Sequence, residues 1–122
     1  MYLECPDSIR VYTLQKPEMS GIYSKINQTR RQKPVWYNSL NDAYIFLSIS
    51  NDWHISEAKH YTADNTFCLA FADGKNARCP QDLDYTIWLN NTWIGGTGVS
   101  VTSRKHDFWL FRKCNPTDSS FT

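Results

Sequence analysis

The segment Pro34 to Ile55, PVWYNSLNDAYIFLSISNDWHI, is the part of the chain that decides the fold. Its aromatic residues are separated by two polar breaks, Asn38 to Asp42 and Asn51-Asp52, which carry the residue types typical of turns. The pattern therefore predicts short strands joined by tight turns. The aromatic residues of the segment are Trp36, Tyr37, Tyr44, Phe46 and Trp53.

Within this segment, Ala43 to Ile49 is apolar or aromatic on both faces of a strand. A strand that is buried on both sides lies in the middle of a sheet. We therefore expect Tyr44 and Phe46 in the core, with Trp53 beside this central strand. Trp36 lies next to a basic run, and we expect it to be more exposed than Trp53.

Outside this segment, short runs rich in β-branched and aromatic residues recur between turn signals, whereas helix signals are poor. A single short helix is predicted within Ser56 to Asp64. The pattern predicts an all-β fold, a small antiparallel sheet or sandwich, as one module over residues 1–122 with a core of about 5–114 and a flexible tail at 115–122. The other predicted strands are Ile9–Leu14, Gly21–Lys25, Val35–Tyr37, Trp53–Ser56, Tyr85–Leu89, Thr92–Ile94, Val99–Thr102 and Phe108–Arg112.

Composition narrows the class of protein. The chain has 122 residues with a net charge of +1, so charge gives no reason to expect nucleic acid as a partner. No apolar run reaches the ~18 residues of a membrane span, so we expect no membrane insertion. The N-terminal residues lack the pattern of a signal peptide, which fits either an intracellular protein or a mature or excised fragment.

None of the four cysteines forms a C-x-x-C pair, so zinc-ribbon and thioredoxin-like functions lose their main support. Their even number, with two near the ends of the chain and two flanking one turn, favours two disulfides in an oxidising compartment. The Asp73-Gly74 dipeptide lies midway between Cys68 and Cys79, and a hairpin there would set these cysteines opposite each other. We therefore predict a Cys68–Cys79 disulfide, which leaves Cys5 to pair with Cys114. The sequons at Asn27 and Asn90 predict glycosylation and favour a secreted or cell-surface protein.

The sequence contains no convincing catalytic, metal-binding or cofactor-binding motif. The serines lack a nucleophile elbow, the glycines match no phosphate loop, and Asp82 and Asp84 are too few for a calcium site. The histidines have no ligand spacing typical of zinc. We therefore predict no enzyme activity, no metal and no cofactor. The histidines are His54, His60 and His106.

Two groups of side chains are candidates for binding. Basic residues gather before Trp36 and Tyr37, with no acid between Glu18 and Asn41, and such a patch suits a sulfated glycan or an acidic protein. A charged, solvated turn explains the same residues. Trp88 and Trp93 bracket LNNT and would meet across a hairpin, as core residues or as a binding surface. The predicted ligand-binding residues are Arg30, Arg31, Lys33, Trp36 and Tyr37.

The order of several short motifs resembles a small repeated extracellular β-module of invertebrate and protist secreted and cell-surface proteins. The motifs begin with Gly21-Ile22-Tyr23 and end with Trp88 and Trp93, and the resemblance covers roughly Gly21 to Thr102, about two-thirds of the chain. The resemblance implies a binding or architectural module rather than an enzyme. We therefore predict a recognition module for a protein partner, in a receptor or matrix protein. A carbohydrate-binding module is the alternative, a small enzyme is third, and oligomeric state stays open. The intervening motifs are Pro34-Val35-Trp36-Tyr37, Tyr44-Ile45-Phe46, Trp53-His54-Ile55 and Cys79-Pro80.

Overall fold

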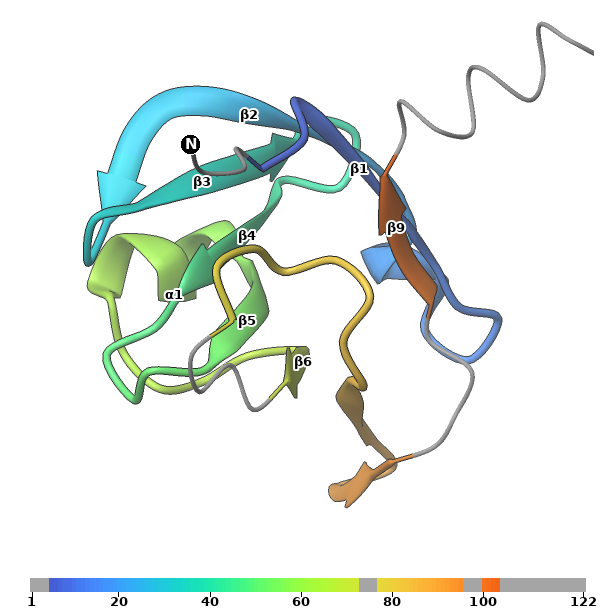
Figure 1. The fold of residues 1–122 in the computed structure, drawn as a ribbon. Coiled ribbons are helices and arrows are strands. Elements are labelled where there is room, and N and C mark those ends of the chain that lie inside the picture. Colours follow the sequence, from blue (N-terminus) through green and yellow to red (C-terminus); the bar gives the residue numbers. More distant parts are fainter. Residues whose placement is uncertain (1–4, 73–76, 96–99, 104–122) are drawn as a thin grey trace, which may run out of the picture.

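The computed structural model describes residues 5–72, 77–95 and 100–103 (Figure 1). Within these residues, nine strands form one antiparallel sheet in the order β8-β7-β6-β5-β4-β3-β2-β1-β9. The predicted all-β class is confirmed, and α1 falls inside the segment where a short helix is predicted. The elements are β1 (Ser8–Tyr12), η1 (Pro17–Met19), β2 (Gly21–Arg30), β3 (Lys33–Asn38), β4 (Ala43–Leu47), β5 (Trp53–Glu57), α1 (Ala58–Ala63), β6 (Ala70–Ala72), β7 (Thr86–Leu89), β8 (Thr92–Ile94) and β9 (Ser100–Ser103).

The sheet from β1 to β8 is a meander, in which neighbours in the chain are neighbours in the sheet. Two of its hairpins turn on residue pairs with positive φ, Arg31-Gln32 between β2 and β3 and Asn90-Asn91 between β7 and β8. This backbone conformation matches the twist of paired strands and is favourable for Asn. The prediction of a central strand is also confirmed, because β4 is fifth in the order of the described sheet.

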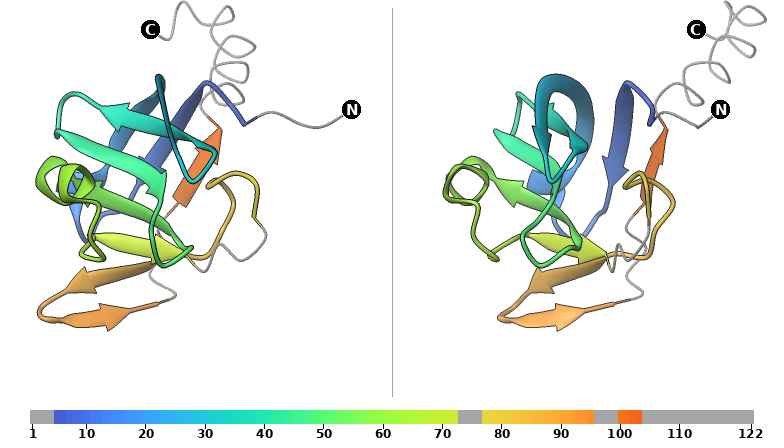
Figure 2. Two further views of the ribbon diagram at one scale, coloured as in Figure 1. Left: turned by 90° about the vertical axis from the view of Figure 1, so that its left-hand side faces the viewer. Right: turned by 60° about the vertical axis from the view of Figure 1, so that its left-hand side comes forward.

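The sheet curls around a core formed by the inward-facing side chains of its strands (Figure 2). Trp36 and Trp53 meet inside it with their ring centroids 6.1 Å apart. A smaller cluster lies on the outer face, where Tyr61 of α1 packs against Val35 and Phe46. Central strand β4 is therefore covered on both faces, as its apolar sequence predicts. Trp53 is buried as expected.

The segment 77–85 lies between β5 and β9 and helps to close the curled sheet (Figure 1). The indole Nε1 of Trp53 donates a hydrogen bond to the Ala77 carbonyl at 3.2 Å. The Asp82 amide donates to the Val101 carbonyl at 2.8 Å, which links the segment to β9. This segment thus joins strands from separate parts of the sheet.

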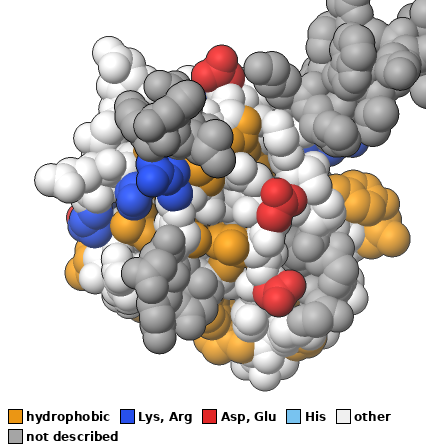
Figure 3. Space-filling view, in the orientation of Figure 1, with side chains coloured by type: hydrophobic (Ala, Val, Ile, Leu, Met, Phe, Trp, Pro, Cys, Tyr) orange, Lys and Arg blue, Asp and Glu red, His pale blue; other side chains and the backbone are white. Residues whose placement is uncertain are grey.

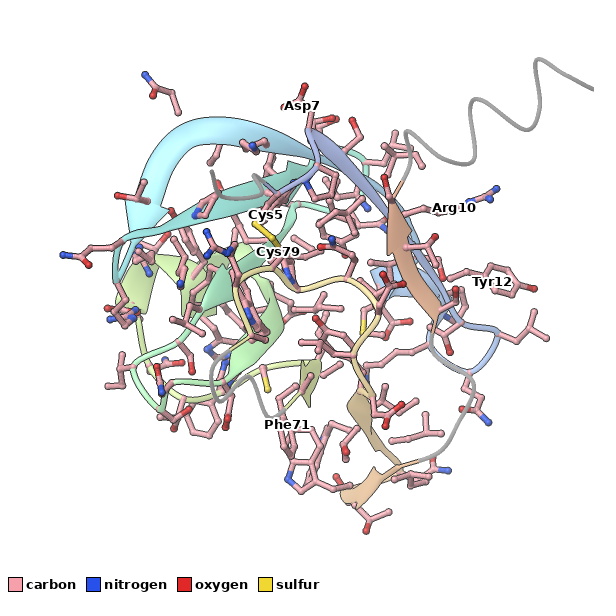
Figure 4. All side chains as sticks on the ribbon, viewed as in Figure 1. Cys5, Asp7, Arg10, Tyr12, Phe71 and Cys79 are labelled. Carbon is pink, nitrogen blue, oxygen red and sulfur yellow. A yellow bond between two sulfur atoms is a disulfide. The ribbon has the colours of Figure 1, made fainter. Side chains whose placement is uncertain are left out.

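A disulfide between Cys5 and Cys79 ties the same segment to the N-terminal part of the described chain (Figure 4). The predicted pairings Cys68–Cys79 and Cys5–Cys114 are therefore wrong. The strand after Cys68 pairs with β5 and β7 and does not run opposite the residues around Cys79. Cys79 instead lies in the irregular segment 77–85, with its Cα 5.5 Å from that of Cys5. Cys68 is a free thiol.

Several predictions concern residues outside the described part of the chain. They are the turn at Asp73-Gly74, the strand Phe108–Arg112, the position of His106, the role of Cys114 and the tail 115–122.

Candidate binding surface

The two arginines of the predicted basic patch are paired within the molecule. Arg30 donates from Nη1 to the Tyr61 carbonyl at 2.9 Å and to Asp64 Oδ1 at 3.0 Å. Its guanidinium carbon lies 3.9 Å from the centroid of the Tyr61 ring. Arg31 also bonds Asp64 through two nitrogens, and its Nε donates to the Leu47 carbonyl at 2.9 Å. The arginines therefore attach the C-terminal end of α1 to the β2–β3 hairpin.

Asp64 supplies the acidic partner that the local sequence around the arginines lacks. It is the left-handed C-cap residue of α1, 33 residues after Arg31 in the chain. Hydrogen bonds from Arg31 lower the pKa of the Asp64 carboxyl, and the charge of Arg30 adds to the effect. The interaction favours the ionised carboxylate, so one of the two positive charges of the arginines is compensated.

The aromatic half of the predicted patch is also arranged differently. Trp36 is fully buried, so the prediction that it is exposed is wrong. It lies opposite Lys25 and Ile45 in the sheet and points inward, where its Nε1 donates to the Pro6 carbonyl at 2.9 Å. Tyr37, on the other face, is half-buried and donates its hydroxyl to Asp42 Oδ1 at 2.8 Å.

Lys33 is half-buried at the start of β3. With Trp36 inside the core and both arginines bonded to Asp64, the five predicted ligand-binding residues do not form one exposed surface. Strands β2 and β3, which carry these residues, are paired in the sheet, but the alternation of a strand sends neighbouring side chains to opposite faces.

A different group of rings, two of them exposed and one half-buried, lies on the outer face of β6, β7 and β8. We call Phe71, Trp88 and Trp93 the aromatic surface. The centroids of Trp88 and Trp93 are 5.0 Å apart with their planes at 63°, and those of Phe71 and Trp93 are 5.0 Å apart at 84°. Trp88 is 37% exposed and Trp93 is 43% exposed. These rings therefore contact each other while keeping a large apolar area in solvent.

The β7–β8 hairpin explains how the two tryptophans meet. Trp88 lies directly opposite Trp93, and the neighbouring residue Ile87 points into the core. The prediction that Trp88 and Trp93 approach across a hairpin is confirmed. Phe71 lies opposite Thr86 on the next strand pair, which places its ring beside that of Trp93.

Hydrogen bonds to the backbone of Trp88 fix the position of β7 beneath the aromatic surface. The Trp88 amide donates to the Leu69 carbonyl at 2.9 Å, and Lys16 Nζ donates to the Trp88 carbonyl at 2.6 Å. The β7 backbone is thereby linked to the segment before β6 and to the segment after β1. In Figure 4, Phe71 lies at the end of the molecule away from the disulfide, and Figure 3 shows hydrophobic side chains reaching the surface at that lower end.

The titratable groups of the described residues do not converge on a reaction centre. His54 is buried, its Nδ1 has no hydrogen-bond partner in the described structure, and burial lowers its pKa. Burial raises the pKa of the Cys68 thiol to about 12, which disfavours a reactive thiolate at neutral pH. In the part of the chain that the structure describes, no three His, Cys, Asp or Glu side chains are grouped as metal ligands.

Both sequon asparagines are exposed, Asn27 within β2 and Asn90 in the β7–β8 turn. None of the described helices is long and apolar enough to cross a bilayer. Comparisons with protein families, curated proteins and solved structures found no match. A functional proposal therefore rests on the arrangement of the described side chains, above all those of the aromatic surface.

Proposed function

We propose that this chain is an extracellular recognition module that binds a protein partner through the aromatic surface. The observation that carries the proposal is the pair Trp88 and Trp93, each more than one-third exposed and held in contact on one hairpin. Tryptophan is enriched among the residues that contribute most to protein–protein binding. A hairpin with backbone contacts on both sides presents such rings with little loss of conformational freedom on binding.

The exposed area is large enough to contribute measurably to affinity. Each indole has about 250 Å² of surface, so the two exposed fractions sum to about 200 Å². At about 25 cal/mol per Å², covering this area would stabilise a complex by about 5 kcal/mol before the costs of association are subtracted. Phe71 adds to this area at the edge of the pair.

The ring geometry favours a protein over a carbohydrate. A sugar presents a broad, nearly flat face, which stacks best on rings that lie in or near one plane. The rings of the aromatic surface meet at 63° and 84°, which creates an angular surface suited to interdigitating side chains. A sulfated glycan also gains less from the basic residues, since the guanidinium groups of Arg30 and Arg31 are both bonded to Asp64.

Two features support an extracellular setting for this proposal. The Cys5–Cys79 disulfide is of a kind that persists in oxidising compartments. The asparagines of both sequons, Asn27 and Asn90, are exposed. A receptor ectodomain or a matrix protein would combine these features with a recognition surface.

The proposal is tested by presenting the chain to an array of extracellular proteins and, in parallel, to a glycan array. We expect protein binders whose affinity falls at least about 30-fold with Trp88→Ala or Trp93→Ala, as for the stronger hot-spot residues. Tyr12→Ala is the matched control, because Tyr12 is a 52% exposed ring on β1. Glycan binding that depends on the same tryptophans would favour the alternative function, and protein binding unchanged by their removal would contradict the proposal.

A further inference from the structure

We propose that Asn90 is an N-glycosylation site whose first sugar stacks on the ring of Trp88. The inference rests on the proposed function in one respect, the extracellular setting, and it adds a means of regulating the aromatic surface. It is built on three features of the β7–β8 hairpin: the exposed acceptor asparagine, the exposed threonine of the sequon, and the exposed ring two residues before the acceptor.

The acceptor lies in a tight turn at the end of a hairpin. Asn90 and Asn91 have φ of 53° and 63° and connect Leu89 to Thr92, which pair across the hairpin. Asn90, Asn91 and Thr92 are all exposed. Within the described structure no protein group forms a hydrogen bond with the Asn90 side chain, so its amide is available to a glycosylating enzyme. Thr92 presents the hydroxyl that the sequon requires.

The transfer reaction makes one bond and breaks one. The Asn90 side-chain nitrogen attacks the anomeric carbon of an oligosaccharide linked to a polyprenyl diphosphate, which is the co-substrate supplied by the secretory pathway. A carbon–nitrogen bond forms, the bond from the anomeric carbon to the diphosphate oxygen breaks, and the nitrogen loses a proton. The chain itself supplies only the acceptor and the threonine hydroxyl.

The ring of Trp88 lies within reach of a sugar attached at Asn90. Asn90 is the first residue of the turn after β7, and Cα atoms two residues apart in a chain are separated by at most about 7 Å, about the span of an amide linkage and part of a pyranose ring. Leu89, between them, packs against the inner core and does not obstruct the outer face. Trp88 is 37% exposed, and its backbone is held by the bonds from Lys16 and to Leu69.

The stacking follows from the charge distribution of the ring. An aromatic ring carries partial negative charge on its face, and the C–H groups of a pyranose carry partial positive charge. A single sugar needs one ring face, so the angle between Trp88 and Trp93 that disfavours a broad platform does not prevent this contact. With the glycan in place, the exposed face of Trp88 is covered, whereas the contact does not require Trp93, directly opposite Trp88 in the hairpin, or Phe71, whose ring contacts Trp93.

The second sequon provides a matched control within the same chain. Asn27 is exposed on β2, and the residue two before it is Lys25, which donates from Nζ to the Cys5 carbonyl at 3.0 Å. A sugar at Asn27 has no exposed ring at the corresponding position. The two sites should therefore accept the same glycan with different effects on stability.

The experiment uses the chain of residues 1–122 secreted from eukaryotic cells behind a cleavable leader. Site occupancy is mapped by mass spectrometry, and the glycans are trimmed enzymatically to a single N-acetylglucosamine. The melting temperature is then compared with that of Asn90→Gln and Asn27→Gln. We expect Asn90 to be occupied and its sugar to raise the melting temperature by about 2–6 °C, while the sugar at Asn27 changes it by less.

The role of the ring is tested by repeating the comparison in a Trp88→Ala background and in a Trp88→Phe background. The increment from the Asn90 sugar should disappear with alanine and persist in part with phenylalanine. An unoccupied Asn90 in the secreted protein, or an increment that survives Trp88→Ala, would overturn the inference. Neither measurement uses a protein partner, so the result for Asn90 can be interpreted even if the proposed recognition function fails its own test.

Discussion

The Cys5–Cys79 disulfide should contribute a large part of the stability of this fold, and its removal provides a sharp test of the described topology. The two cysteines are 74 residues apart in sequence. In the chain-entropy treatment, closing a loop of that length restricts the unfolded chain by about 15 cal/mol/K, or about 4.4 kcal/mol at 25 °C. The bond also holds segment 77–85 against the N-terminal part of the sheet.

The perturbation is the double variant Cys5→Ala, Cys79→Ala, assayed by urea unfolding with tryptophan fluorescence. With a denaturant dependence of about 1–3 kcal/mol per M for a small domain, the loss should lower the unfolding midpoint by about 1.5–4 M. Cys68→Ala is the control, because it removes a half-buried thiol and should cost less than about 1 kcal/mol. Equal losses in the two variants, or an unchanged midpoint in the double variant, would refute the assigned pairing.

Three further outcomes follow from individual side chains. Trp36→Ala should lower the free energy of unfolding by about 3–5 kcal/mol in a urea titration, because the indole is fully buried; a wild-type midpoint would show that Trp36 is exposed. Asp64→Asn should lower the free energy of unfolding by about 1 kcal/mol at pH 7. The loss should become smaller as the pH falls through the lowered pKa of Asp64, because the wild-type protein then loses the same ion pairs. Equal losses at pH 7 and pH 3 would argue against pairing of Asp64 with Arg31. Because the pKa of His54 is lowered in the folded state, the unfolded chain binds a proton more readily, and the free energy of unfolding should decrease as the pH falls below about 6.5. His54→Leu should weaken this pH dependence. An identical pH profile in the variant would contradict burial of a neutral His54 ring.

Much of the fold was predictable from local pattern because each strand in the meander pairs with its neighbours in sequence. Alternating apolar residues and Asn- or Asp-containing turns indicate such strands and hairpins. Strand β6, AFA, was missed because it is short and alanine has little β preference. The turn at Arg31-Gln32 was anticipated only as a charged, solvated turn and not as a tight hairpin, since neither residue type favours the positive φ that both adopt.

The binding surface was less predictable, because its composition depends on contacts distant in sequence. Adjacent positions in a strand show that Trp36 and Tyr37 face opposite ways, but not which of them faces the core. The acid that pairs with the arginines, Asp64, comes from the end of α1 and leaves no local signal. The approach of Trp88 and Trp93 was predictable since two residues of turn separate their strands, whereas Phe71 joins them only through the missed strand β6.

The most direct test of recognition through the aromatic surface is hydroxyl-radical footprinting of the chain, free and bound to the partner identified on the protein array. Oxidation of each tryptophan is read by mass spectrometry. In the free chain, produced without glycans, Trp88 and Trp93 should be oxidised and Trp36 protected, in keeping with their exposure. In the complex we predict strong protection of Trp88 and Trp93 and unchanged oxidation of Tyr12. Full oxidation of both tryptophans in the saturated complex would contradict the account and place recognition elsewhere on the molecule.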